Sequence, residues 1–371
     1  MKGAYDMQQP SFAFFRLPGA DHYTGIVQRS GAPERLSSPS DLNGRSGFVV
    51  APFVASPSCP LLLIRPDETV RVAVGDGGED GGGRGDALLR EVASSLRLQP
   101  CPYPAVPPSV ARSAYGRSFA SCHERLMSGE FSKIVLSRRS VEPYAQGDDP
   151  ARMFLRACEM YPRMFVVLVS TPAGGTWLAA TPEILLDGDG DTWRTMALAG
   201  TMKMRYPVES TAWGDKDRQE QRYVADYIAG VLARLGADAA ETGPYTALAG
   251  GLVHLRSDFT FSLPAGVGAG DVVSLLHPTP AVCGLPCEAT RRHLLAVEPH
   301  SRRYYSGFTG PFGIGGETRL YVSLRCMEIF SGCCALYAGG GLLRDSTEMK
   351  EWAETEAKMK TMRRITEQGA G

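Results

Sequence analysis

Short turns rich in glycine and aspartate, placed between apolar runs, constrain the fold of this chain more than any other feature. The turn DGDGD (187–191) joins one pair of such runs, and GIGGET (313–318) joins another. Turns this short favour hairpins, whose two strands run antiparallel. Helical segments also occur, but they do not alternate strictly with the strands as they do in a doubly wound parallel sheet. We therefore expect a layered α+β architecture built on antiparallel sheets.

Hydrophobic patterning divides the chain into many strands and a few helices. It predicts helices over residues 118–130, 151–162, about 212–236 and about 347–367. It predicts strands over residues 12–17, 47–53, 61–66, 69–74, 133–143, 164–170, 175–180, 183–188, 193–200, 252–263, 304–314, 318–330 and 334–340.

The first third of the chain differs in composition from the rest, being rich in proline, glycine and serine. GDGGEDGGGRGD (75–86) has nothing to bury and predicts a flexible loop. QPCPYPAVPPSV (99–110) predicts an extended linker. We expect residues 1–115 to form a variable N-terminal part and residues 116–371 to carry the functional site, with both intertwined in one globular unit.

Composition excludes several classes of partner. The chain has 371 residues, a formal net charge of -1 and a pI near 6.6, so it offers no basic field for nucleic acid or an anionic membrane. No run approaches ~20 apolar residues, and the N-terminus lacks a signal-peptide core. We expect a soluble, cytoplasmic protein whose cysteines, in neither a disulfide nor a zinc pattern, are buried free thiols: Cys59, Cys101, Cys122, Cys158, Cys283, Cys287, Cys326, Cys333 and Cys334.

The last predicted helix carries a row of charged side chains. Glu351, Glu354 and Lys358 are spaced i, i+3 and i+7, so they project from one face. A solvated amphipathic helix with an ion pair between Glu354 and Lys358 explains this pattern as well as a binding site does. The helix alone therefore does not predict a function.

Glu220 is a carboxylate on an apolar helical stripe that continues through Val224 and Ile228. Carboxylates seldom lie inside a protein unless they are paired or bound to a cation. An edge carboxylate paired with an arginine remains an equal alternative. If Glu220 met a carboxylate of the last helix, the two with water molecules would suit an octahedral Mg²⁺ that also holds a substrate carboxylate.

Two further residues suit acid–base chemistry. Lys133 opens the apolar strand KIVLSRR, where burial would lower its pKa and make it a usable base. Glu183 enters an apolar strand after Pro182, where burial would raise its pKa and make it a usable acid. A snorkelling lysine and an exposed strand-start glutamate are the structural alternatives.

Glycine-rich turns and one arginine suggest how an anion could be held. Backbone amides in LAGT (198–201) and YAGGGLL (337–343) can approach a carboxylate closely, and neither turn is a nucleotide-binding P-loop. Arg325 could grip a second carboxylate, although it could also be a structural strand residue. LLHPTPAVCGLP (275–286) contains too many breakers for a helix or strand, so we expect a shaped loop with Ala281 at its centre.

The order of these segments along the chain resembles that of the chorismate-utilising enzymes, which include isochorismate synthase, salicylate synthase and the synthase subunits for anthranilate and aminodeoxychorismate. The resemblance covers about residues 118–366 and implies two large antiparallel sheets packed face to face with flanking helices. The ordered segments are K-I-V-L-S-R (133–138), T-P-E (181–183), L-A-G-T (198–201), D-x-x-E (217–220), H-P-T-P-A-V-x-G-L-P (277–286), Y-x-G (305–307), V-S-L-R (322–325), Y-A-G-G-G (337–341) and E-W-x-E-T-x-x-K (351–358).

This resemblance also implies roles for individual residues. Glu220 and Glu354 would bind Mg²⁺, and Glu351 would assist them through water. Lys133 would activate water for attack at C2 of chorismate, and Glu183 would protonate the departing C4 hydroxyl. The groups implied to hold the substrate are Gly200, Thr201, His277, Ala281, Arg325, Gly339, Gly340, Gly341 and Lys358.

Ala281 separates the members of this family. Members that use ammonia typically have P-A-G-T in this loop, and salicylate synthases typically have threonine at the position of Ala281. The alanine found here resembles the pattern of isochorismate synthases. The sequence thus favours an isochorismate synthase that needs no amidotransferase subunit. We expect its product to feed menaquinone synthesis, the commoner housekeeping use, with a catechol siderophore as the alternative. A salicylate-forming or amino-forming enzyme and a non-catalytic chorismate-binding protein remain alternatives. Two departures from the family pattern are Gly340, where alanine is common, and DSTE (345–348), where G-S-D-P is common.

Overall fold

The computed structural model describes residues 9–74, 84–204, 212–249 and 251–367. These residues form two nine-stranded sheets in which all strand pairs are antiparallel, which confirms the predicted α+β sandwich. In the first sheet the strands lie in the order β14 (Gly284–Leu285), β7 (Lys133–Pro143), β18 (Cys333–Leu342), β17 (Cys326–Ile329), β9 (Gly175–Thr181), β8 (Phe165–Thr171), β1 (Ser11–Arg16), β2 (His22–Gln28) and β6 (Glu68–Ala73). In the second they lie in the order β12 (Ala239–Ala249), β13 (Leu252–Phe261), β11 (Trp193–Lys203), β10 (Ile184–Gly188), β16 (Thr318–Val322), β15 (Phe308–Phe312), β4 (Gly47–Ala51), β5 (Leu61–Ile64) and β3 (Glu34–Leu36).

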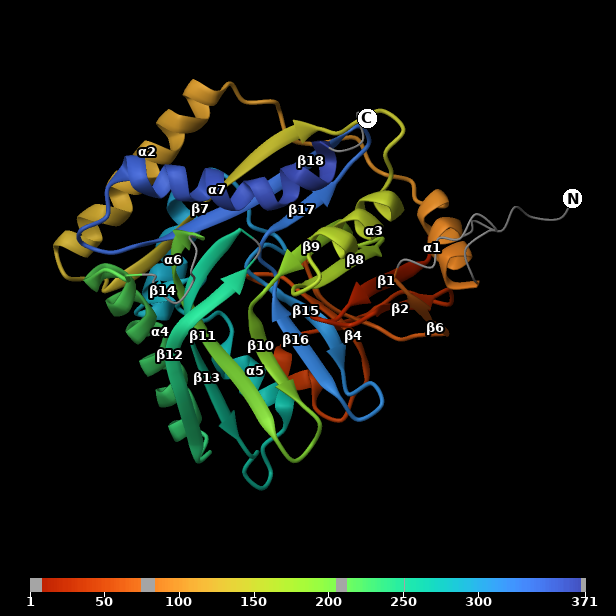
Figure 1. Ribbon diagram of the computed structural model, residues 1–371, viewed down its shortest axis with the longest axis horizontal. Helices are drawn as coiled ribbons and strands as arrows, with labels where there is room; N and C mark the ends of the chain where they lie inside the picture. Colours follow the sequence, from red (N-terminus) through yellow and green to blue (C-terminus); the bar gives the residue numbers. More distant parts are fainter. Residues whose placement is uncertain (1–8, 75–83, 205–211, 250, 368–371) are drawn as a thin grey trace, which may run out of the picture.

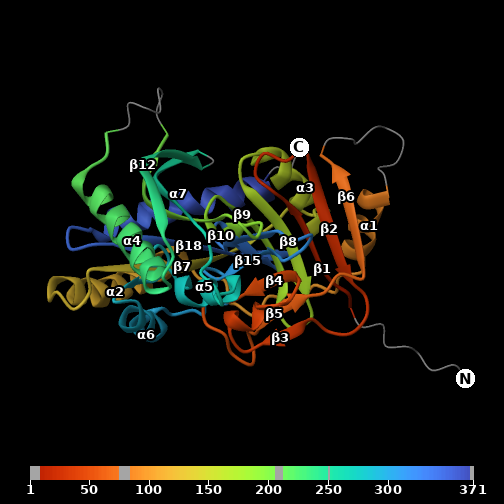
Figure 2. The ribbon, with the colours of Figure 1, turned by 90° about the horizontal axis from the view of Figure 1, so that it is seen from below.

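Helices cover the outer faces of both sheets. Helices α4 and α1 lie at opposite ends of the molecule in both views (Figures 1 and 2). The helices are α1 (Arg84–Ser94), α2 (Pro108–Met127), α3 (Pro150–Met160), α4 (Asp215–Arg234), α5 (Ala269–Leu276), α6 (Cys287–Val297) and α7 (Glu348–Glu367), with a short 3-10 helix at Pro39–Leu42.

The alternation of side chains along a strand explains this layering, because successive residues point to opposite faces of a sheet. In β8, Val166 and Leu168 pack toward α1, α3 and α7, whereas Phe165, Val167 and Val169 pack into the core between the two sheets. A third core lies between the second sheet and helices α4 and α5. The chain is therefore a four-layer sandwich of helices, sheet, sheet and helices.

Two of the points at which the chain passes from one sheet to the other are neighbours. Pro182 and Glu183 connect β9 of the first sheet to β10 of the second, and residues 323–325 connect β16 of the second sheet to β17 of the first. The two crossovers are tied together, because the Thr181 hydroxyl donates to the Val322 carbonyl and the Val322 amide donates to the Glu183 carbonyl. These two crossovers form a seam between the sheets, and the seam positions the candidate site.

Several sequence predictions need correction at the level of elements. The run 318–330 is not one strand, because Arg325 has a φ of 45° and the chain changes sheet there. Residues 108–110, expected in an extended linker, form the first turn of α2, which begins ten residues before the predicted helix because a proline fits the first turn of a helix. The expected flexible loop falls largely on residues 75–83, which lie outside the described residues, and residues 84–86 begin α1.

The sequence prediction also missed β2, β3, β12, α1 and α5. All nine cysteines are free thiols, as expected, but Cys101, Cys287 and Cys333 are only partly buried rather than buried. Within the described ranges, every helix is too short or too polar to cross a membrane.

Candidate active site

A cavity opens at the seam between the two sheets. It encloses about 610 Å³ of space, counting the part open to solvent. Both sheets, two helices and the 277–286 loop contribute to its wall. The lining residues are Val135, Pro182, Glu183, Leu198, Ala199, Gly200, Thr201, Glu220, His254, Ala281, Val282, Tyr305, Leu324, Arg325, Tyr337, Ala338, Gly339, Gly341 and Lys358.

Glu183 reaches this cavity because it occupies the first crossover between the sheets. Its side chain is buried, and burial raises its pKa to about 8, although Lys133, Lys358 and Arg325 pull in the opposite direction. A carboxyl group with that pKa carries a proton at neutral pH and can donate it. The sequence prediction of a raised pKa at this position is confirmed.

Lys133 begins β7 and forms an ion pair with Glu220 of α4. The Lys133 Nζ atom lies 3.1 Å from the Glu220 Oε1 atom, and the lysine side chain is completely buried. Burial alone would raise the pKa of Glu220, but Lys133, Lys216 and Lys358 outweigh this effect and hold the pKa below its usual value. Glu220 therefore stays ionised beside a buried amine, in contrast to the protonated Glu183.

Arg325 lies in the second crossover, where its left-handed backbone turns the side chain into the cavity wall. Its Nη2 atom donates to the His254 Nε2 atom at 3.0 Å, and its buried Nη1 atom has no hydrogen-bond partner among the described residues. Burial, followed by Arg325 and Lys358, lowers the pKa of His254 far below its usual value, so this histidine is neutral. An unpartnered buried guanidinium donor in a cavity is suited to an anionic ligand.

His254 also links Arg325 to the glycine turn of β11. Since its Nε2 atom accepts from Arg325, its Nδ1 atom carries the hydrogen and donates to the Gly200 carbonyl at 2.8 Å. The Thr201 hydroxyl lies 3.3 Å from the same nitrogen. Gly200 has a φ of 71°, and the β11–β13 register shifts between Ala199 and Met202, so β11 bulges at the cavity.

The glycines of the segment 337–343, expected in a turn, lie within strand β18, and three carboxylates and three lysines meet beside them. Lys216 donates to the Glu351 Oε1 atom at 2.6 Å, and Lys358 pairs with the Glu354 Oε1 atom at 2.7 Å. Burial alone would lower the pKa of Lys216, but the carboxylates Glu351, Glu220 and Glu354 raise it, so all three act on one ammonium group. The three carboxylates of the cluster therefore stabilise a positive charge placed among them.

This cluster fits a divalent cation. The groups in it that could bind a metal are carboxylates, whose oxygen atoms are the ligands that Mg²⁺ prefers. In addition, the buried Glu351 Oε2 atom has no hydrogen-bond partner among the described residues. Within the described ranges, no three Asp, Glu, His or Cys side chains are already arranged as a ligand shell. A bound cation would therefore draw these carboxylates away from the lysines that now pair with them.

Glycines in β18 make room for these side chains on both faces of the strand. A Cβ atom at Gly341 would lie 2.1 Å from the Glu220 Oε1 atom, and one at Gly339 would lie 2.8 Å from the Tyr305 hydroxyl. A Cβ atom at Gly340 would point the other way and lie 3.1 Å from the Glu351 Oε2 atom. Gly339 and Gly341 thus border the cavity, whereas Gly340 faces the carboxylates of α7.

The proline-rich loop forms one wall of the cavity through Ala281 and Val282. Its end, β14, pairs with Ile134 and Lys133 of β7, so the loop lies beside the base candidate. His277 does not line the cavity. Its Nε2 atom lies 3.2 Å from the Pro52 carbonyl, and its ring packs edge-on against Phe308.

The structure brings most of the predicted site residues together and adds some. Glu183, Gly200, Thr201, Glu220, Ala281, Arg325, Gly339, Gly341 and Lys358 line the cavity, and Lys133, Glu351, Glu354 and Gly340 lie directly behind its wall. Sequence reasoning missed His254 and Lys216. A histidine inside the apolar strand LVHLRS, and a lysine one helical turn before Glu220, were the available signals.

The chain is similar to known proteins over most of its length. A family model described as chorismate binding enzyme matches residues 93–367. Isochorismate synthase EntC of Escherichia coli (strain K12) is 28% identical over 242 residues, which are 63% of this chain and 62% of EntC. Isochorismate synthase DhbC of Bacillus subtilis (strain 168) is 33% identical over 257 residues, which are 65% of this chain and 64% of DhbC.

The fold comparison extends over nearly the whole chain. MenF, the menaquinone-specific isochorismate synthase from Escherichia coli, superposes with a TM-score of 0.73 over 98% of this chain and 90% of that structure, at 21% identity. That identity establishes the shared fold alone. In sequence, the chain matches slightly less than two thirds of the length of EntC and of DhbC. The family model nevertheless spans about three quarters of the chain, and the protein therefore belongs to the chorismate-binding enzyme family.

Proposed function

We propose that the protein is an isochorismate synthase, which adds water at C2 of chorismate while the C4 hydroxyl leaves. One observation carries the proposal most. A protonated carboxyl group, Glu183, lines the cavity from a crossover between the sheets, and a buried amine, Lys133, lies directly behind the cavity wall at the start of β7. Both are flanked by groups that suit a dianion. The similarity to EntC, DhbC and MenF, all named isochorismate synthases, supports the same activity.

The substrate carries two carboxylates, and the site offers cationic groups for both. The unpartnered Nη1 atom of Arg325 would donate to one of them. Lys358 donates to the Gly339 carbonyl at 2.8 Å and lines the same cavity. Its charge and the backbone of Gly339–Gly341 would hold an anion there. The neutral His254 would keep the Arg325 fork in orientation without adding charge.

In the proposed reaction a proton is taken up on one side of the ring and released on the other. Lys133 accepts a proton from water as the water oxygen bonds to C2. Both ring double bonds shift, from C1=C2 to C1=C6 and from C5=C6 to C4=C5, as the C4–O bond breaks. Glu183 gives its proton to the departing oxygen, so one water molecule enters and one leaves. Placing the acid in a crossover and the base at the start of β7 allows both transfers without direct neutralisation between them.

The cation in this proposal is Mg²⁺, held by Glu220 and Glu354 with Glu351 assisting through water. When bound, it would offset the charge of a substrate carboxylate and polarise it. Because Lys133 and Lys358 now pair with two of these carboxylates, cation binding would release both amines toward the substrate. Binding of the cation would thereby make the base available.

Product identity tests this function. Purified protein is given chorismate and Mg²⁺, with and without an ammonium salt, and the products are identified by NMR. We expect isochorismate alone under both conditions. Salicylate with pyruvate would indicate a salicylate synthase, an amino product would indicate an amidotransferase-type synthase, and no product under either condition would indicate a binding protein.

We also propose that the protein works without an amidotransferase subunit and that its product feeds menaquinone synthesis. A catechol siderophore is the competing use, since among the similar isochorismate synthases MenF is named menaquinone-specific whereas another is named vibriobactin-specific. Deletion of the gene, followed by measurement of menaquinone and of catechols, decides between these uses. Loss of catechols with menaquinone unchanged would contradict our assignment.

A further inference from the structure

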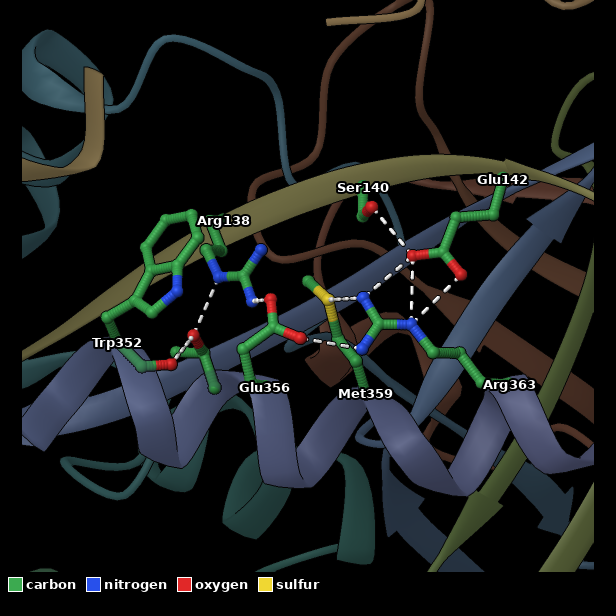
Figure 3. A network of polar contacts seen from close by, with 8 residues as sticks. Arg138, Ser140, Glu142, Trp352, Glu356, Met359 and Arg363 are labelled. Carbon is green, nitrogen blue, oxygen red and sulfur yellow. Dashed lines mark hydrogen bonds and ion pairs between the residues drawn. The ribbon is translucent and has the colours of Figure 1, made fainter. Parts of the chain in front are cut away.

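A network of polar contacts holds helix α7 against strand β7, on the side of β7 that faces away from the cavity. Figure 3 shows Arg138 and Glu142 of β7 reaching toward Trp352, Glu356 and Arg363 of α7. Along β7, Lys133 and Val135 face the cavity side, whereas Ile134, Leu136 and Arg138 alternate to the helical side. The strand that carries the base candidate therefore also carries the contact to the helix of the carboxylates.

Arg138 is the most constrained member of this network. Its Nε atom donates to the Thr355 hydroxyl at 2.6 Å, its Nη2 atom pairs with Glu356, and its Cζ atom lies 3.9 Å from the centroid of the Trp352 ring (Figure 3). Arg138 is 8% exposed and Thr355 is completely buried. The Thr355 hydroxyl donates in turn to the Trp352 carbonyl at 2.7 Å.

These contacts fix the rotation of α7 about its axis. Trp352, Thr355 and Glu356 are spaced i, i+3 and i+4, so they form one face of the helix, and Glu351 and Glu354 each directly precede a residue of that face. Arg138 pairs with Ala338 across β7 and β18, two residues before Gly340. Gripping the first face therefore directs the two carboxylates toward Gly340, where their oxygens are found.

We infer that Arg138, acting through Thr355 and Trp352, is the positioning residue that sets Glu351 and Glu354 for cation binding. Arg138 does not contact the proposed cation or substrate, and lysine could not replace it, because a single ammonium group cannot bond Thr355 and Glu356 while stacking on an indole. The inference rests on the proposed function insofar as a divalent cation binds at these carboxylates.

The network supplies its own matched control. Arg363, further along α7, donates to both oxygens of Glu142 at 2.8 and 2.9 Å and to Glu356 at 2.7 Å, so it pairs with two carboxylates where Arg138 pairs with one (Figure 3). However, it lies two helical turns beyond Glu356, at the far end from Glu351 and Glu354. Loss of Arg363 should loosen the end of the helix and leave the carboxylates in place.

Cation affinity, measured without reference to turnover, tests the inference. The full chain is titrated with Mn²⁺, and free Mn²⁺ is measured by electron paramagnetic resonance. Chorismate is present throughout. Active variants are measured after chorismate and product have reached equilibrium, and inactive variants with chorismate unconverted. We expect Arg138→Gln to raise the Kd for Mn²⁺ by about tenfold or more, as is typical for groups that orient metal ligands. Arg363→Gln should change it by less than about twofold. Melting temperature and circular dichroism of each variant are recorded alongside.

A second variant keeps the inference testable if Arg138→Gln does not fold. Thr355→Val preserves side-chain shape but removes the acceptor for Arg138, and it should raise the Kd in the same direction, whereas Thr355→Ser should restore it. Equal Kd values for wild type and Arg138→Gln, or for wild type and Thr355→Val, would overturn the inference and leave the proposed function standing. Equal increases for Arg138→Gln and Arg363→Gln would also overturn it. A wild-type chain that binds no Mn²⁺ would overturn both the inference and the metal-dependent function.

Discussion

At the scale of single residues, Glu183 and Arg325 owe their positions to the chain's passage between sheets. Each lies in a crossover, where the strand pattern is interrupted and a polar side chain can point along the seam rather than into a core. The two groups then differ in function because their charges differ. Burial protonates the carboxyl group of Glu183, while the guanidinium of Arg325 remains charged and keeps one donor unpartnered.

The first prediction concerns the pH dependence of Glu183. Its pKa is raised to about 8, so the protonated form required of an acid is complete well below pH 8 and is lost as the pH rises through that value. We expect kcat/KM, which reports the free enzyme, to fall above pH 8. Glu183→Gln should lower kcat by about 10²- to 10⁴-fold, the usual contribution of a positioned acid. A wild-type profile that stays flat to pH 9.5 would rule out Glu183 as the acid.

The second prediction concerns Gly341. In Gly341→Ala the new Cβ atom would meet the Glu220 carboxylate at 2.1 Å, so the carboxylate must move although the backbone need not. We expect kcat/KM to fall by about 10²-fold, the scale of a misplaced catalytic group, with little change in melting temperature.

Gly230→Ala in α4 is the control for this substitution, because its Cβ atom would meet nothing closer than 3.8 Å. It should leave activity unchanged and stabilise the helix by about 0.5–1 kcal/mol. Gly340→Ala, which introduces the residue common in the family, should cost less activity than Gly341→Ala, because its Cβ atom would lie 3.1 Å from a movable carboxylate oxygen. If Gly341→Ala kept full activity, Glu220 would not need its present position.

At the scale of elements, the 277–286 loop shows how a breaker-rich segment becomes part of a rigid wall. The Val135 amide donates to the Cys283 carbonyl at 2.7 Å and the Ser132 amide donates to the Leu285 carbonyl at 2.9 Å, so the loop ends as an edge strand on β7. Its prolines therefore shape the approach, and β7 fixes its end. This arrangement holds Ala281 in the wall of the cavity.

The third prediction concerns product choice at Ala281. Ala281→Thr would place a hydroxyl group in the cavity wall, and Ala281→Val would add the same volume without a hydroxyl. We expect Thr to lower isochorismate formation and to yield salicylate or, with ammonium, an amino product, measured by NMR of the product mixture. Val should only slow the reaction. Identical product mixtures from both variants would show that bulk, and not polarity, matters at this position.

The fourth prediction concerns the two helices that bring carboxylates to the cluster. Glu220→Gln removes the charge contributed by α4 and keeps the shape of the side chain. We expect a loss of turnover that no Mg²⁺ concentration restores. We also expect Mg²⁺ binding to weaken by at least about tenfold. Glu124→Gln, at an exposed position of α2, is the control and should behave as wild type. Unchanged Mg²⁺ dependence in Glu220→Gln would remove this residue from the metal site.

At the scale of the whole molecule, the sequence predicted the architecture better than the path of the chain. The hairpin turns and the buried strand β8 are local features, so the antiparallel sandwich could be anticipated from them. The switch of sheets at Arg325 could not, because V-S-L-R reads as uninterrupted strand and only packing of the two sheets requires a left-handed residue there. The edge strand β12, which is largely exposed, carries little apolar pattern and was missed for that reason.

The site followed the same division. Glu220, Glu183 and Lys133 were identifiable because a charged residue beside an apolar run is conspicuous in sequence. His254 and Lys216 were missed because their roles depend on partners distant along the chain, Arg325 and Glu351. His277 was expected at the substrate because its loop forms the wall, but its ring turns toward Pro52 and Phe308, which lie far away in sequence.

The most direct test of the central claim, addition of water at C2, is the origin of the C2 oxygen in the product. Chorismate is converted in H₂¹⁸O with Mg²⁺, the reaction is stopped early, and isochorismate is examined by mass spectrometry and ¹³C NMR. If water adds at C2, the product carries one ¹⁸O atom, bonded to C2 and at no other position. Isochorismate without ¹⁸O would mean that the C4 oxygen moved within the molecule, and it would contradict the roles given to Lys133 and Glu183.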